Sequence, residues 1–159
     1  SKNLESEKKN WLASLGYVPQ QVTLFNDTIE SNISFFENLN HDKNLREKLN
    51  KVIIEANLEN FVKNLPEKEN TIVGENAAKL SGGQIQRIGI ARALFNNPDF
   101  IIFDESTSSL DEKNENEIMQ FIYSLKNSKT VLFISHKKEI LNNCDKIFEV
   151  KNKKILKIK

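Results

Sequence analysis

Two carboxylates, Asp104 and Glu105, stand directly after the apolar run Phe100–Phe103. Such a run is typical of a buried strand in a parallel sheet, so the pair is predicted to leave a strand end. Side chains alternate along a strand, and the two carboxylates therefore point in different directions and serve different purposes. One could bind Mg²⁺, which takes one or two protein carboxylates together with phosphate oxygens. The other could orient an attacking water or accept its proton, although the pair alone fits a solvated strand end better.

A glycine-rich helix start, Ser81-Gly82-Gly83-Gln84, is the second candidate. Ser81 can cap the helix, and Gln84 three residues later can complete a capping box. The two glycines would let a phosphate approach bare backbone amides, and the helix dipole adds positive potential there. An ordinary capping box explains the segment equally well, because capping boxes are common.

Two more polar residues could take part in the same chemistry. His136 follows the apolar run Val131–Ile134 and could donate a hydrogen bond to a phosphate oxygen. A lone histidine at a strand end is more often structural. Gln20 follows Pro19 and could reach Mg²⁺, or a water bound to it, through the amide oxygen. A glutamine in a loop after proline is otherwise unremarkable.

The elements that must position these residues predict an α/β fold. A short strand is expected at 15–18, and the apolar runs 100–103 and 131–134 are interpreted as parallel strands buried on both faces. Helices are expected at 81–96 and 111–125 from their capping residues and apolar spacing. In such open sheets, ligands bind outside the carboxyl ends of the strands. The candidate residues after the second and third strands stand at those ends.

The rest of the chain adds a helical insert and a terminal hairpin. Apolar residues recur at three- and four-residue steps from 42 to 65, which predicts a helical block, and Thr28 can cap a short helix before it. The runs 147–150 and 155–158 are predicted to pair as a β-hairpin, although their turn contains no glycine. Five aromatic residues are interpreted as packing residues rather than as residues that stack on a ligand: Trp11, Tyr17, Phe25, Phe35 and Phe36. Arg87 and Arg92 are expected to anchor their helix through carboxylate pairs.

Composition narrows the classes of protein that fit. The 159 residues fit one domain, and 23 Lys and Arg against 22 Asp and Glu give a formal net charge of +1. This balance gives no basis for a protein that coats nucleic acid. The single cysteine, Cys144, excludes an intramolecular disulfide and suits a reducing compartment. No apolar run approaches the ~18 residues of a membrane span. The chain begins at Ser1, and we expect it to be a piece of a longer protein.

The order and spacing of these motifs resemble the nucleotide-binding domain of ABC transporters. The resemblance is carried by Leu80–Gln84 with Gln86-Arg87-Ile88 after it, by Phe100–Glu105, and by Thr107–Asp111 and His136. It implies a truncated P-loop NTPase (RecA-like) fold with a parallel-sheet core, an α-helical subdomain insert and a C-terminal β-hairpin. The whole chain, 1–159, would be a partial ATPase domain, with the helical subdomain at 38–94.

The resemblance also implies a role for each candidate residue. Glu105 would be the catalytic carboxylate, with Gln20 and His136 assisting it, and Asp104 with Gln20 would bind Mg²⁺. The signature segment would close over ATP held by a second domain, and Asp111 would communicate between the two sites; the residues of that segment are Ser81, Gly82, Gly83 and Gln84.

At the level of the whole protein, the resemblance implies an exporter-type transporter that couples ATP hydrolysis to transport. Its cofactors would be ATP and Mg²⁺. Its partners would be a second nucleotide-binding domain and a fused or associated transmembrane domain at the cytoplasmic face of the inner or plasma membrane, with no nucleic acid. Gly16–Asn32 also resembles flippases of lipid-linked oligosaccharides and polysaccharides, and 71–75 resembles the loop that contacts the transmembrane domain. Asn76-Ala77-Ala78 departs from exporters, which usually have a glycine there.

A phosphate-binding P-loop is missing from this sequence, because none of its five glycines begins a G-x-x-x-x-G-K-[ST] match. The P-loop supplies most of the nucleotide affinity, so we expect the chain alone to be inactive. We also expect the loss of the P-loop strand to leave Phe100–Phe103 as an unpaired, apolar sheet edge. Two alternatives stay open: a non-enzymatic or defective ABC-like regulatory module, and a soluble ABC ATPase of DNA repair. The second would carry long coiled coils, and no sustained heptads occur here.

Overall fold

The computed structural model describes residues 11–12, 14–37, 39, 42–74, 80–107 and 110–159. Several expectations fall outside these ranges: those for the first ten residues, for Asn76-Ala77-Ala78, and for Ser108-Ser109 within the motif after Thr107. The boundaries 38–94 of the helical subdomain remain a prediction, and residue 38 itself lies outside the described ranges.

A three-stranded parallel sheet forms the centre of the fold, as predicted. Its strands are β1 (Leu15–Val18), β4 (Phe100–Asp104) and β5 (Thr130–Ile134), in the order β1-β4-β5. The expectation of an unpaired edge at Phe100–Phe103 is wrong, because β4 pairs with β1 on one side and with β5 on the other. Within the described sheet, the edges are therefore β1 and β5.

The sheet is buried on one face rather than two. Ile101 and Phe103 are fully buried, and they share a core with residues of α5 (Gly82–Leu94) and α6 (Glu112–Ser124). The opposite face carries Tyr17 and Leu132, which are 51% and 45% exposed. The prediction that both apolar runs are buried on both faces is therefore wrong, because helices cover only the face of Ile101 and Phe103.

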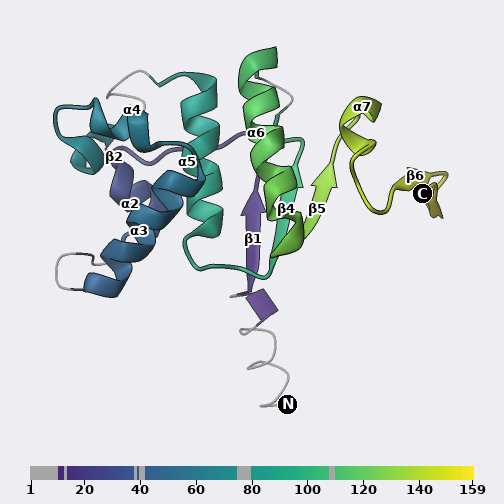
Figure 1. Ribbon diagram of the computed structural model, residues 1–159, viewed down its shortest axis with the longest axis horizontal. Helices are drawn as coiled ribbons and strands as arrows, with labels where there is room; N and C mark the ends of the chain where they lie inside the picture. The colour runs from purple at the N-terminus through teal and green to yellow at the C-terminus, as the bar shows by residue number, and fades with distance from the viewer. Residues whose placement is uncertain (1–10, 13, 38, 40–41, 75–79, 108–109) are drawn as a thin grey trace.

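The helical part of the chain packs beside α5, away from the C-terminal end (Figure 1). It contains α2 (Ile29–Ser34), α3 (Lys43–Glu55), α4 (Glu59–Lys63) and the 3₁₀ turn η1 (Lys68–Asn70). The predicted helical block at 42–65 is broken at Asn57, whose φ of 54° is left-handed. The break lets Leu58 enter the core with no exposed surface. Two short strands, β2 (Asp27–Thr28) and β3 (Ile72–Val73), pair antiparallel next to α2.

The aromatic side chains expected to pack inside are exposed instead. The exposed fractions are 62% for Trp11, 43% for Phe25, 59% for Phe35 and 53% for Phe36. Phe35 and Phe36 follow α2 with φ of 54° and 65°, so a left-handed turn directs the chain outward there. Their rings lie 6.3 and 5.3 Å from the ring of Phe25. We call Phe25, Phe35 and Phe36 the aromatic patch.

A buried polar network supports the aromatic patch. Asn32 is fully buried; its Oδ1 accepts from the Phe25 amide at 2.8 Å, and its Nδ2 donates to the Phe25 carbonyl at 3.0 Å. Arg92 on α5 donates to the Asn32 carbonyl at 2.7 Å and to the Thr23 carbonyl at 3.1 Å. Its guanidinium lies 5.1 Å from the centre of the Phe35 ring. The prediction that Arg92 pairs with a carboxylate is therefore wrong, because the backbone carbonyls of Asn32 and Thr23 accept its hydrogen bonds.

The C-terminal hairpin forms as predicted. After η2 (Leu125–Asn127) and β5 come the short helix α7 (Lys138–Leu141) and then β6 (Phe148–Lys151) and β7 (Lys154–Lys157). Asn152 and Lys153 form the turn with φ of 51° and 60°, which is the type I′ geometry without a glycine. Figure 1 shows the hairpin at the end of the molecule opposite the helical part. Across the described ranges, we find no helix with the length and apolar character of a membrane span.

Candidate active site

A small cavity of about 110 Å³ lies at the carboxyl ends of β4 and β5. Its walls are Glu105, Thr107, Ser135, His136 and Lys137. The parallel register explains why these residues meet: Asp104 pairs with Ile134, and the Glu105 amide donates to the Ile134 carbonyl at 3.0 Å. The chain leaves both strands at the same level of the sheet, which is where ligands of open α/β sheets bind.

Glu105 is held between two of the other predicted residues. Its Oε1 lies 2.8 Å from His136 Nε2, and its Oε2 accepts a hydrogen bond of 2.9 Å from Gln20 Nε2. The backbone of Glu105 has a φ of 45°, a left-handed value that costs energy for a residue other than glycine. The structure thus brings Gln20, Glu105 and His136 together. A carboxylate fixed in this way keeps lone pairs that can orient a water molecule and accept its proton.

Asp104 has a different partner, Tyr17, which the sequence reasoning treated as a packing residue. The Tyr17 hydroxyl donates to Asp104 Oδ2 at 2.9 Å. Tyr17 lies opposite Ile102 in the β1–β4 register, so Asp104, two residues further along, projects from the same face. This hydrogen bond raises the pKa of the Tyr17 phenol. Only the strand register reveals this contact, because the two residues are far apart in the chain.

The donor set suits Mg²⁺ delivered with a nucleotide better than a resident metal ion. Among the described residues, no three His, Cys, Asp or Glu side chains are grouped so as to hold a metal. Mg²⁺ at phosphate-binding sites needs only one or two carboxylates, since phosphates and waters complete its shell. Asp104 can supply one such carboxylate. Gln20, the second predicted Mg²⁺ ligand, contacts Glu105 in this structure.

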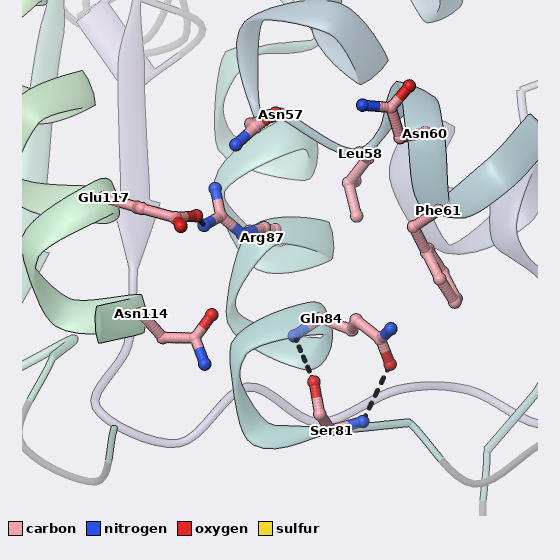
Figure 2. Close-up of a pocket in the computed structure, with 9 residues that line it drawn as sticks. All are labelled: Asn57, Leu58, Asn60, Phe61, Ser81, Gln84, Arg87, Asn114 and Glu117. Atoms are coloured by element: carbon pink, nitrogen blue, oxygen red, sulfur yellow. Dashed lines mark hydrogen bonds and ion pairs between the residues drawn. The ribbon is translucent and has the colours of Figure 1, made fainter. Parts of the chain in front are cut away.

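The predicted capping box is present at the start of α5 (Figure 2). Ser81 Oγ accepts from the Gln84 amide at 3.2 Å, and Gln84 Oε1 accepts from the Ser81 amide at 2.8 Å. A polar pocket of about 280 Å³ lies beside this helix start. Its lining residues are Asn57, Leu58, Asn60, Phe61, Ser81, Gln84, Arg87, Asn114 and Glu117.

The two glycines of this segment differ in their surroundings. A Cβ at Gly83 would lie 2.7 Å from Asn114 Oδ1, so close packing of α5 against α6 explains that glycine. A Cβ at Gly82 would meet Leu110 Cδ2 at 3.8 Å, an ordinary contact, and Gly82 is exposed. A side chain at 83 would therefore have to displace the Asn114 amide, whereas a Cβ at 82 would make only an ordinary contact within the described chain.

The predicted site residues fall into two separate groups. Gln20, Glu105 and His136 meet after the strands, and Asp104, next to Glu105 in the chain, contacts Tyr17 instead. Ser81 and Gln84 line the other pocket, and the two cavities share no described residue. Asp111 belongs to neither cavity. It caps α6, where Oδ1 accepts from the Asn114 amide at 3.0 Å and Oδ2 from Asn114 Nδ2 at 2.6 Å. These hydrogen bonds lower the pKa of Asp111.

The sequence analysis did not assign a role in the site to three residues near Glu105, namely Thr107, Glu115 and Lys137. Lys137 Nζ lies 2.7 Å from both carboxylate oxygens of Glu115, and Thr107 Oγ1 donates to Glu115 Oε1 at 3.1 Å. Thr107 lies two residues after Glu105, and Lys137 directly follows His136, so the sequence alone could have placed both near the site. Nothing in the sequence pattern joins them to Glu115. On the signature helix, Arg87 forms its expected carboxylate pair with Glu117, at 2.6 Å.

Comparisons with known proteins agree with the fold and the motifs. The family model described as ABC transporter matches residues 1–108. The ATP-dependent lipid A-core flippase of Pseudoalteromonas translucida is 43% identical over 139 residues, which cover 87% of this chain and 23% of the flippase. The multidrug resistance protein pgp-1 of Caenorhabditis elegans is 39% identical over 156 residues, covering 98% of this chain and 11% of that protein.

Among solved structures, a bacterial Atm1-family ABC exporter with ATP bound matches with a TM-score of 0.72 and 36% identity. The match covers 86% of this chain and 24% of the exporter chain. The chain thus spans about a quarter or less of the length of these similar proteins. The predicted P-loop NTPase class is confirmed by this structural match. With a family model that matches more than half of its residues, the chain belongs to the ABC transporter family.

Proposed function

We propose that this chain is the part of an exporter-type ABC transporter that activates water for ATP hydrolysis and covers the ATP of a second domain. The observation that carries the proposal is the position of Glu105 between Gln20 and His136, 2.9 and 2.8 Å from its two oxygens. A carboxylate so placed suits a general base or water-orienting group in phosphoryl transfer.

In this proposal, Glu105 orients the water that attacks the γ-phosphorus and accepts the proton that the water loses. The new bond joins the water oxygen to phosphorus, and the bond to the bridging oxygen of ADP breaks. Gln20 holds the carboxylate in one orientation. His136, whose side chain is 90% exposed, can turn toward the γ-phosphate and donate a hydrogen bond to an oxygen that gains charge.

Asp104 would hold the Mg²⁺ that arrives with ATP, together with the Gln20 amide oxygen. The ion would neutralise charge on the β- and γ-phosphates. Tyr17 would keep the Asp104 carboxylate in a fixed orientation, since its hydroxyl donates to Oδ2.

The signature segment would act on a different ATP molecule, held by a second nucleotide-binding domain in a homodimer or heterodimer. The separation of the two cavities supports this, and so does the exposed Gly82, where glycine is unexplained by internal packing. Asp111 would pass information between the two sites from its place at the start of α6.

The aromatic patch supports a transmembrane domain as the second partner. Three exposed rings stand together, two of them on the left-handed turn after α2, and exposed aromatic clusters mark interaction surfaces. The chain would then lie at the cytoplasmic face of the inner or plasma membrane. The lipid A-core flippases among the similar proteins favour a lipid-linked saccharide as cargo.

Of the two alternatives, a soluble ATPase of DNA repair has less support, because the similar proteins are transporters. A defective regulatory module differs from the proposal only in whether a P-loop completes the site. We propose that the P-loop comes from elsewhere in a longer protein and that the 159-residue chain alone is inactive.

Isothermal titration of the 159-residue chain with Mg·ATP tests that point. We expect no binding in the micromolar range, because the phosphate cradle that supplies most of the affinity is missing from the sequence. The same titration on the longer protein should give micromolar binding. Micromolar affinity of the 159 residues alone would contradict the need for a separate P-loop.

Glu105→Gln in the transporter that carries this chain should lower ATP turnover by about 100-fold or more, because the general base is lost. ATP binding should persist, since Gln is isosteric and the binding groups remain. Steady-state phosphate release and nucleotide affinity are the measurements, and Glu112→Gln, on the exposed start of α6, is the matched control. Unchanged turnover in Glu105→Gln would refute the proposed function.

Gly82→Ala and Gly83→Ala should separate ligand contact from packing. Gly83→Ala should lower the free energy of unfolding by about 1 kcal/mol, because the new methyl group displaces the Asn114 amide, which donates to Asp111. Gly82→Ala should leave stability within about 1 kcal/mol and still impair ATP-driven association of two domains. Thermal unfolding and light scattering with ATP measure the two effects. Normal association in Gly82→Ala would argue against a ligand at this glycine.

Phe36→Ser should weaken association with the transmembrane domain by about tenfold, because exposed aromatic anchors carry much of the binding energy of an interface. The domain should remain folded, since the Phe36 ring is half exposed. Co-purification and transport assays measure the effect. Phe148→Ser, at an equally exposed position of the hairpin, is the control, and an equal effect of both changes would contradict the assignment.

A further inference from the structure

The loops that carry Glu105 and His136 are tied to one side chain that the proposed mechanism does not use. Glu115, on the first turn of α6, receives Lys137 Nζ at 2.7 Å on both carboxylate oxygens. Its Oε1 also accepts from Thr107 Oγ1 at 3.1 Å. Thr107 stands two residues after Glu105 and Lys137 directly after His136. One carboxylate therefore joins the segment that follows β4 to the segment that follows β5.

The burial of these groups distinguishes them from ordinary surface ion pairs. The Glu115 side chain is 15% exposed and Thr107 is 2% exposed, so water screens their contacts poorly. Lys126 and Asp145, by contrast, are 48% and 68% exposed and form an ordinary surface ion pair, which contributes little to stability. The Lys137 ammonium contacts both oxygens of the Glu115 carboxylate, and this restricts the orientation of the carboxylate.

Glu115 itself has a rigid support. Its backbone amide donates to the Asp111 carbonyl at 2.9 Å in the first turn of α6. Three α6 side chains anchor the helix in the core, with exposures of 6% or less: Ile118, Met119 and Ile122. The loops that follow the strands thus attach to a side chain on a packed helix.

We propose that Glu115, with Thr107 and Lys137, is a positioning group that sets the separation of the Glu105 carboxylate and the His136 imidazole. The inference rests on the proposed function for its effect on ATP turnover. In this proposal Glu115 and Lys137 act through Glu105 and His136, whose loops they join, and not by direct participation in the reaction. A displacement of about 1 Å between reacting groups costs on the order of 100-fold in rate, so loss of the clamp should slow the chemical step.

The test compares Lys137→Met, Lys137→Arg and Glu115→Gln in the transporter that carries this chain. Lys137 is 47% exposed, so Lys137→Met should fold normally even where Glu115→Gln does not. We expect Lys137→Met to lower kcat for ATP hydrolysis by about 10- to 100-fold, with KM for ATP unchanged within twofold. Lys137→Arg should restore most of the rate, because arginine binds both carboxylate oxygens. Lys126→Met, which breaks the exposed pair, should change neither value.

A double change provides a second readout. If one clamp is at work, Glu115→Gln combined with Lys137→Met should cost no more in kcat than the larger single effect. Unchanged kcat in Lys137→Met, or no recovery in Lys137→Arg, would overturn the inference. So would a loss of kcat that merely follows a lower melting temperature, since that marks a structural role. Failure of the proposed function is seen separately, as unchanged turnover in Glu105→Gln.

Discussion

The parallel pairing of β4 with β5 is the constraint on which the site depends. Because Asp104 lies opposite Ile134 and the Glu105 amide continues the ladder to the Ile134 carbonyl, the chain leaves both strands at one level. Glu105 and His136 can then meet although 31 positions separate them. A shift of one residue in this register would turn the side chains of β4 to the opposite face. It would separate Asp104 from Tyr17 as well, since that contact needs both to project from the same face.

Helix α6 supports both halves of the site. Asn114 packs against Gly83 at the start of α5, and Glu117 holds Arg87 one turn further along that helix. Glu115, between them in sequence, faces the loops after the strands. Neighbouring residues of a helix point in different directions, so a single helix start can contact two elements at once. Asp111 caps this turn and accepts from the backbone amides of both Asn114 and Glu115.

Local sequence signals predicted much of the fold, and the errors concern contacts between residues far apart in the chain. The capping box at Ser81 and the hairpin near the C-terminus each depend on residues a few positions apart, which a sequence displays. The central position of β4 depends on which strands pair across the whole chain. The apolar runs predicted strands that are buried on both faces of the sheet, yet Leu132 is 45% exposed. The hydrogen bond from Tyr17 to Asp104 joins β1 to β4, and the register of these two strands cannot be predicted from the sequence alone.

The two cavities impose a limit on how this chain can work. Glu105 and His136 line the cavity after the strands, whereas Ser81 and Gln84 line a different pocket, and no described residue belongs to both. A Cβ at Gly83 would meet the Asn114 side chain of the neighbouring helix, whereas a Cβ at the exposed Gly82 would meet only Leu110, at an ordinary contact distance. If both groups serve ATP, they serve two ATP molecules. Under the proposed function, each of those molecules would be shared with another domain, and pairing of two domains would then be a condition for hydrolysis.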